Sequence, residues 1–164
     1  MKTRELALGA LLAALSVVIP IAFGFLRVVI GPWTGTVTSH VPTMLGMFVS
    51  PAVALAAGLG SGVGFLIATG QAIVAARAFT HVVWGLTGAL LYRRGMKPWW
   101  VLALLLPIHG LLEAAVVLPF GWSLSQSLTI VGIGTSLHHT IDSGITLLTL
   151  GIVLASTGKR EVPE

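Results

Sequence analysis

The sequence predicts an all-α integral membrane protein, a bundle of six transmembrane helices with both termini in the cytoplasm. Of its 164 residues, 55% are hydrophobic and 9% are charged, whereas a soluble domain carries about 25% charged residues. Its apolar runs are separated by short turn-rich stretches and are long enough to cross a bilayer as helices. The chain is too short for a second domain, so we expect a single transmembrane domain over residues 1–164.

The breaks between apolar runs set the expected helix boundaries. Pro20 and Gly24 are expected to kink or tilt the outer half of the first helix. Ser50 and Pro51 separate a short second helix from the third, whose alternating glycines permit close contact between helices. The expected helices cover residues 3–29, 40–49, 51–69, 71–92, 99–117 and 128–155.

The basic residues predict the orientation of these helices. The loops at 31–39 and 118–128 contain no lysine or arginine. Six spans place all the basic segments beside the bilayer on one side, which the positive-inside rule assigns to the cytoplasm. A five-span alternative, merging the second and third helices, would split them between both sides. The basic segments contain Lys2 and Arg4, then Arg93, Arg94 and Lys97, then Lys159 and Arg160.

Ionisable side chains inside these apolar segments are the candidate site. Such residues are costly in a membrane and by default mark a functional site. Three pairs have the i,i+4 spacing that puts both side chains on one helix face, and the six-span topology places most of them in the outer half. This asymmetry favours a cavity open to the outside over a channel. The pairs are Arg77 with His81, His109 with Glu113, and His138 with Asp142; His40, His139, Trp33 and Trp84 complete the candidate site.

Each of these residues also has a structural interpretation. Arg77 could bind a carboxylate or phosphate, extend to the interface as a snorkelling side chain, or pair with Glu113. His81 could contact a ligand or hold two helices together, and Asp142 could pair with a histidine. The tryptophans could stack on a flat ring or belong to the interfacial aromatic belt.

Several functions are excluded or disfavoured by what the sequence lacks. There is no cysteine, which excludes disulfides, thiolate metal sites and cysteine nucleophiles. The glycines of the third helix are not a phosphate-binding loop, since no lysine follows them and they lie in an apolar span. No protease motif accompanies the His–Glu or His–Asp pairs, so we expect no enzyme and no cofactor. The basic net charge reflects topology signals and predicts no nucleic-acid binding.

Four stretches resemble the substrate-binding S component of energy-coupling factor (ECF) vitamin transporters. Ala10 and Ala14 match the Ala-xxx-Ala motif of the first helix in that family, and residues 40–51 (HVPTMLGMFVSP) are similar to its second-helix segment. Residues 76–81 (ARAFTH) and 134–142 (GTSLHHTID) look closest to the niacin-type branch.

The resemblance implies a multi-pass protein of a prokaryotic plasma membrane that binds a small water-soluble vitamin. Ala10 and Ala14 would dock on a transmembrane coupling subunit, and two ATPase subunits would supply the energy. The loop after the first helix would cap the site. Nicotinate is the favoured ligand: Arg77 would clamp its carboxylate, His81 or His138 would hydrogen-bond the ring nitrogen, and a tryptophan would cover the ring.

Other ligands and functions stay open at this stage. Pantothenate, a pyrimidine and pyridoxine are alternative vitamins. Divalent metal uptake is a further alternative, because five histidines with Glu113 and Asp142 could ligate a transition metal. Metal-specific relatives in the superfamily carry a histidine directly after the initiator methionine, where this chain has Lys2. Arg77 would also repel a cation, so we assign no metal ligands. An accessory membrane protein with a purely structural polar network is the remaining alternative.

Overall fold

The structure, a computed structural model, describes residues 3–30 and 33–156 of the chain. The predicted basic residues Lys2, Lys159 and Arg160, and Gly31 of the predicted outer loop, lie outside the described residues.

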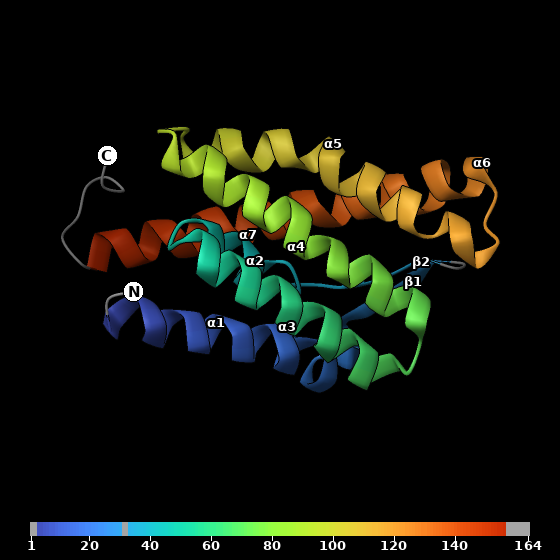
Figure 1. Cartoon of the computed structure of the whole chain (residues 1–164), viewed down its shortest axis with the longest axis horizontal. Helices are drawn as coiled ribbons and strands as arrows, with labels where there is room; N and C mark the ends of the chain where they lie inside the picture. Colours follow the sequence, from blue (N-terminus) through green and yellow to red (C-terminus); the bar gives the residue numbers. More distant parts are fainter. Residues whose placement is uncertain (1–2, 31–32, 157–164) are drawn as a thin grey trace.

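Long helices build most of the molecule (Figure 1). Within the described residues, five helical segments are long and apolar enough to cross a membrane. Their boundaries agree with the predicted ones to within a few residues, except at the end of the first helix and the start of the last. They are α1 (Thr3–Ala22), α3 (Pro51–Thr69), α4 (Ala72–Arg93), α5 (Pro98–Val116) and the final segment, made of α6 (Leu124–Gln126), a π-helical stretch (Ser127–Gly132) and α7 (Ile133–Ser156).

The prediction that the first helix continues to residue 29 is wrong. α1 ends at Ala22, a 3₁₀ turn covers Gly24–Leu26, and β1 (Arg27–Ile30) pairs antiparallel with β2 (Trp33–Thr36). Three consecutive β-branched residues occupy 28–30, and such residues favour extended over helical backbone. The predicted loop before the second helix therefore supplies one strand of this antiparallel pair, β2, and the turn that follows it.

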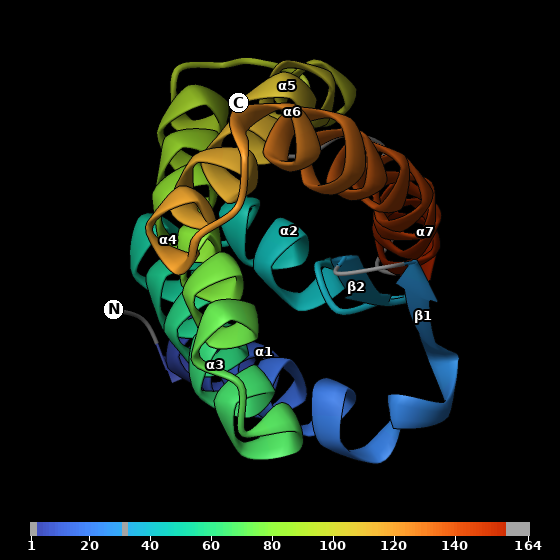
Figure 2. The ribbon, with the colours of Figure 1, turned by 90° about the vertical axis from the view of Figure 1, so that its right-hand side faces the viewer.

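The second helix does not span a membrane by itself. α2 (Val41–Met47) has seven residues, which gives a length of about 10 Å against a hydrocarbon core of about 30 Å. β2, a turn and α2 together lead the chain back along the bundle to the start of α3 (Figure 1). Seen from the end, α2 and β2 lie in the middle, with the long helices around them (Figure 2). Non-helical backbone is tolerated at membrane depth when protein encloses it in this way.

Glycines bring α3 unusually close to its neighbours. A Cβ on Gly58 would lie 2.8 Å from the backbone nitrogen of Val82 in α4, and a Cβ on Gly64 would lie 2.8 Å from Cα of Val17 in α1. No side chain fits at such distances, so these backbones touch directly. The prediction that alternating glycines permit close helix contact is confirmed.

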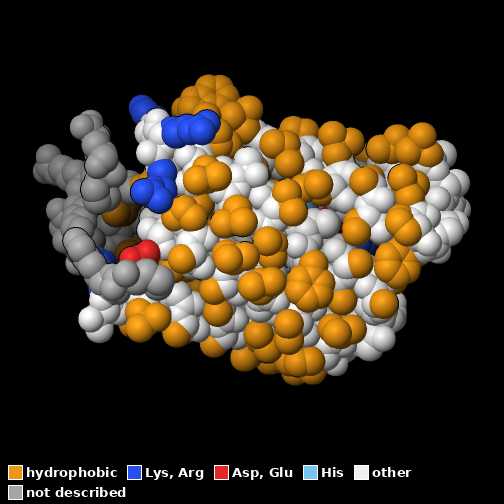
Figure 3. Space-filling view, viewed as in Figure 1, with side chains coloured by type: hydrophobic (Ala, Val, Ile, Leu, Met, Phe, Trp, Pro, Cys, Tyr) orange, Lys and Arg blue, Asp and Glu red, His pale blue; other side chains and the backbone are white. Residues whose placement is uncertain are grey.

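The outer surface of the bundle is apolar and its basic residues gather at one end. Large exposed hydrophobic side chains occur on every long helix, including Leu11, Leu59, Val83, Leu111 and Leu148. Figure 3 shows hydrophobic side chains over the middle of one face and lysine and arginine at the left end. The start of α1, the α4–α5 loop and the end of α7 all lie at that end (Figure 1). This arrangement is that of a multi-pass membrane protein with a lipid-facing belt.

Candidate functional site

All ten candidate site residues lie in one buried region. α4, α5 and α7 supply most of them, and β2 and the turn before α2 supply the rest. None is more than 6% exposed. The candidates Trp33, His40, Arg77, His81, Trp84, His109, Glu113, His138, His139 and Asp142 are therefore brought together although they are spread over more than a hundred positions of sequence.

Arg77 and Glu113 form an ion pair at the centre of this region. Nε and Nη2 of Arg77 donate to Oε2 of Glu113 at 2.9 and 2.6 Å, and the Thr135 hydroxyl donates to the same oxygen at 2.5 Å. The other carboxylate oxygen, Oε1, faces His109 Nε2 at 3.2 Å and His81 Nε2 at 3.9 Å. The pair links α4, α5 and α7, so Arg77 is not a snorkelling interface residue.

A chain of histidines continues from Glu113 through the bundle. His109 Nδ1 lies 3.0 Å from His139 Nδ1, and His139 Nε2 lies 3.1 Å from the carbonyl oxygen of Leu102. The i,i+4 spacing of His109 and Glu113 in α5 brings them into direct contact. His139, one residue from His138 in α7, points to a different neighbour.

Asp142 holds the turn before α2 against α7. Its Oδ1 accepts from the Thr38 backbone N–H at 2.8 Å, and its Oδ2 accepts from the His40 backbone N–H at 3.0 Å. Nε2 of His138 lies 3.2 Å from Oδ2 and 3.0 Å from the Thr36 carbonyl oxygen. Thr38 has a positive φ of 74°, a conformation that a β-branched residue avoids. The two carboxylate oxygens of Asp142, which accept from the backbone N–H groups of Thr38 and His40, stabilise this turn.

The tryptophans differ in their surroundings. Trp33 donates from Nε1 to the Thr135 hydroxyl at 3.2 Å, and Cζ of Arg77 lies 6.0 Å from its ring centroid. Trp84 is fully buried, with its ring centroid 4.6 Å from that of His109. Trp33 therefore covers the ion pair from the hairpin side, whereas Trp84 supports the histidines from within the core.

A small cavity lies beside Arg77 and Glu113. Its volume is about 20 Å³, room for one water-sized species and far less than the roughly 300 Å³ of a typical small-molecule pocket. Within the part of the chain that the structure describes, the hydroxyls of Thr34 and Ser39 are buried without a hydrogen-bond partner, and both residues line the cavity.

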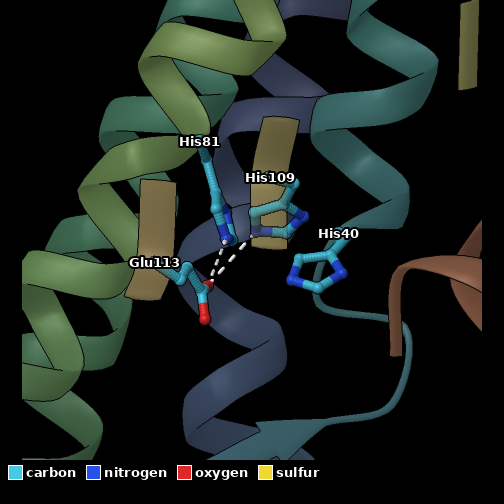
Figure 4. A group of neighbouring side chains, drawn as sticks. All are labelled: His40, His81, His109 and Glu113. Carbon is cyan, nitrogen blue, oxygen red and sulfur yellow. Dashed lines mark hydrogen bonds and ion pairs between the residues drawn. The ribbon is translucent and has the colours of Figure 1, made fainter. Parts of the chain in front are cut away.

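Among residues 3–30 and 33–156, two groups of side chains are close enough to hold a metal ion. The first is His40, His81, His109 and Glu113, shown in Figure 4, and the second is His40, His138 and Asp142. In each group the ligand atoms lie within 4.8 Å of one another. The assignment of no metal ligands from the sequence did not foresee this convergence.

Sequence reasoning missed three uncharged polar residues of the site, Thr34, Ser39 and Thr135. A cluster of threonines in the predicted outer loop was the available signal for Thr34. Thr135 lies one helical turn before His138 and His139, so it falls on a face close to theirs, but nothing in its sequence context distinguishes it from other threonines of the chain.

The small residues of α1 divide between two faces. Gly9 is buried, and a Cβ there would lie 3.1 Å from Cγ2 of Val53 in α3. A Cβ on Gly60 of α3 would lie 2.8 Å from the carbonyl oxygen of Ala13. Ala10 and Ala14 are instead exposed on the outside. Packing within the chain therefore uses Gly9 and Ala13, and the two candidate docking alanines remain accessible to a partner.

The fold and the site together define an all-α, multi-pass membrane protein with a polar, histidine-rich site enclosed between its helices. Over 93 residues, 57% of this chain, it is 33% identical to the "Niacin transporter NiaX" of Lactococcus lactis subsp. cremoris (strain MG1363). The aligned stretch spans 41% of that relative's length. No family model matches the chain, and no solved structure matches it.

This similarity confirms the resemblance to the niacin-type branch that the sequence motifs indicated. The name of the relative describes a transporter. The match therefore agrees with a role in transport and with an embedding in the membrane.

Proposed function

We propose that this protein is the substrate-binding S component of an ECF-type importer, located in the plasma membrane of a prokaryote with both termini in the cytoplasm. Its ligand is a small water-soluble vitamin, with nicotinate as the first candidate. The observation that carries the proposal is a buried guanidinium beside a polar cavity in a chain similar to a niacin transporter.

Arg77 is the group that binds the carboxylate of the ligand. A guanidinium has five N–H donors in a planar fork that matches a carboxylate. The hydrogen bonds to Glu113 involve Nε and Nη2, so the fork has further donors for a second carboxylate. Glu113 fixes the orientation of Arg77 before the ligand arrives, which reduces the entropy lost on binding.

The surroundings of Arg77 suit a flat heteroaromatic ring. Trp33 and His138 flank the cavity side of the ion pair with ring centroids 6.1 Å apart, and an aromatic ligand would stack on such faces. His81 or His138 would donate to the ring nitrogen. Thr34 and Ser39 supply hydroxyls with unused hydrogen-bonding capacity at the cavity wall.

The ligand needs more room than the cavity of about 20 Å³ provides. The hairpin of β1 and β2 is the element that would move, because β1 is largely exposed and β2 is held to α7 by side-chain hydrogen bonds, from Trp33 to Thr135 and between His138 and the Thr36 carbonyl oxygen. Outward movement of Trp33 would open the cavity toward the hairpin end of the bundle.

Energy for transport would come from partner subunits. The alternating glycines of α3 form no phosphate-binding loop, and the exposed Ala10 and Ala14 offer a surface on which a transmembrane coupling subunit would pack closely. Two ATPase subunits would complete the importer.

Binding of nicotinate and nicotinamide to the purified protein tests the proposal. The two ligands have the same ring, but nicotinamide lacks the carboxylate that Arg77 would bind. A hydrogen bond to a charged group contributes about 1.5–3 kcal/mol, so nicotinate should bind roughly 10- to 100-fold more tightly. Arg77→Ala should abolish this preference, whereas Arg94→Ala, which alters an exposed loop arginine, should keep it.

Three results would contradict the proposal in part or as a whole. Equal affinity for nicotinate and nicotinamide would show that Arg77 does not recognise the carboxylate. If the protein binds pantothenate, a pyrimidine or pyridoxine and does not bind nicotinate, the proposed ligand is wrong. The assignment as an S component would then still hold. Failure of all of these vitamins would overturn the assignment.

A further inference from the structure

Four ligand-type side chains from three parts of the fold converge on one point. His40 lies at the start of α2, His81 comes from α4, and His109 and Glu113 come from α5 (Figure 4). Each offers one ligand atom, and these atoms all lie within 4.8 Å of one another. The three histidines are at most 2% exposed and Glu113 is 3% exposed.

The spacing of these atoms is close to that around a tetrahedral metal ion. With metal–ligand bonds of about 2.0–2.1 Å, neighbouring ligand atoms stand roughly 3.3 Å apart. Glu113 Oε1 lies 3.2 Å from His109 Nε2 and 3.9 Å from His81 Nε2. The edge between Glu113 and His109 already has the required length, and the edge between Glu113 and His81 would have to shorten when the ion binds.

Hydrogen-bond accounting requires a positive species at this point. The Leu102 carbonyl only accepts, so His139 Nε2 donates to it. If both histidines are neutral, His139 Nδ1 then accepts from His109 Nδ1. This leaves the lone pair of His109 Nε2 facing Oε1 of Glu113 at 3.2 Å. A carboxylate oxygen and an unprotonated nitrogen repel each other unless a cation lies between them.

A metal ion accounts for more of the geometry than a proton does. A proton joins one donor to one acceptor, and the 3.9 Å between His81 Nε2 and Glu113 Oε1 is too long for such a bond. His40, His81 and Glu113 also line the cavity of about 20 Å³, whose size admits one ion or water. A single ion would engage all four side chains at once.

Neighbouring groups hold His109 and Glu113 in place by hydrogen bonds, as the residues around a metal site orient the metal ligands. His109 directs its other nitrogen to His139, which is in turn fixed by Leu102, and such support is usual for metal-bound histidine. Arg77 and Thr135 occupy Oε2 of Glu113 and leave Oε1 toward the histidines. Glu113 also neutralises Arg77, which answers the objection that Arg77 would repel a cation.

We propose that His40, His81, His109 and Glu113 form a binding site for one divalent transition-metal ion, with Zn²⁺ as the best match. Imidazole and carboxylate ligands suit this class of ion. The alternative group of His40, His138 and Asp142 is less available, because both oxygens of Asp142 already accept backbone N–H groups. The inference rests on this geometry and not on the proposed vitamin.

The test is titration of chelator-treated, purified protein with Zn²⁺ and Co²⁺. We expect one ion per chain by elemental analysis and calorimetry, a raised thermal midpoint, and the visible absorption of tetrahedral Co²⁺. His81→Gln and His109→Gln should each weaken Zn²⁺ binding at least 10-fold. His138→Gln, which changes a neighbouring histidine of the second group only, should bind Zn²⁺ as the parent protein does.

A further variant separates this inference from the proposed function. Arg77→Gln should still bind one Zn²⁺ per chain, since Thr135 continues to hold Oε2 of Glu113, yet should lose its preference for nicotinate. Absence of stoichiometric Zn²⁺ binding or of the Co²⁺ spectrum in the parent protein would overturn the metal site, whatever the variants do. Equal loss of Zn²⁺ in His138→Gln would also overturn it, in favour of the second group.

Discussion

Arg77 of α4 and Glu113 of α5 are joined by two hydrogen bonds, of 2.9 and 2.6 Å, in a region where each of the two residues is at most 6% exposed. Removal of one partner from such a pair leaves an uncompensated buried charge, which costs about 3–5 kcal/mol. The pair therefore constrains the helix arrangement as well as the site.

Arg77→Met and Glu113→Leu should each lower the stability of the detergent-solubilised protein by about 3–5 kcal/mol, because each leaves its partner charge buried alone. The double variant should be more stable than either single variant, since an apolar pair replaces an ion pair. Thermal unfolding of the four proteins measures this coupling. Additive losses would mean that the two residues act independently.

Gly58→Ala should destabilise the bundle by about 1–3 kcal/mol, the usual cost of overpacking. The added methyl would meet the backbone of α4 at 2.8 Å from the nitrogen of Val82, and backbone cannot move aside as a flexible side chain does. Gly144→Ala is the matched control in α7, where a Cβ meets nothing within 4 Å. It should be neutral or slightly stabilising, and a similar loss in both variants would contradict direct α3–α4 contact.

Asp142→Asn should loosen the turn before α2 without unfolding the bundle. An amide has one oxygen in place of two, so one of the backbone N–H groups of Thr38 and His40 loses its acceptor. An unsatisfied buried donor costs about 1–3 kcal/mol. Hydrogen–deuterium exchange should rise at these two amides and remain unchanged in α3, and unchanged exchange at both would refute the role assigned to Asp142.

Ala14→Leu should weaken association with the proposed coupling subunit and leave nicotinate binding by the isolated protein intact. Ala14 is exposed on α1, and a larger side chain would prevent the close helix approach that small residues permit. Ala103→Leu, an equivalent change at an exposed position of α5, is the control. Co-purification of the complex gives the readout, and equal recovery with both variants would place the docking surface elsewhere.

The local signals of the sequence located the long helices well and singled out ionisable residues that the structure buries together. Ser50 and Pro51 marked the start of α3, and Ser50 does cap that helix, accepting from the Val53 backbone N–H at 3.3 Å. Arg77 and Glu113 were recognised as ionisable residues within apolar helices. Burial of a charge in a membrane is costly, so such residues usually have a functional or structural role. The hairpin was missed because an apolar run of valines and isoleucine continues the hydrophobicity of α1, and hydrophobicity alone does not separate helix from strand.

The sequence by itself determined that the chain lies in a membrane, where its long helices run and which residues are too polar for their segments, since these depend on composition and spacing along one helix. Only the tertiary structure decided which residues meet. The i,i+4 rule predicted the contact of His109 with Glu113, but the approach of His40 and His81 to the same carboxylate depends on how α2, α4 and α5 pack. Distances between helices are set by that packing, and no pattern within a single helix encodes them.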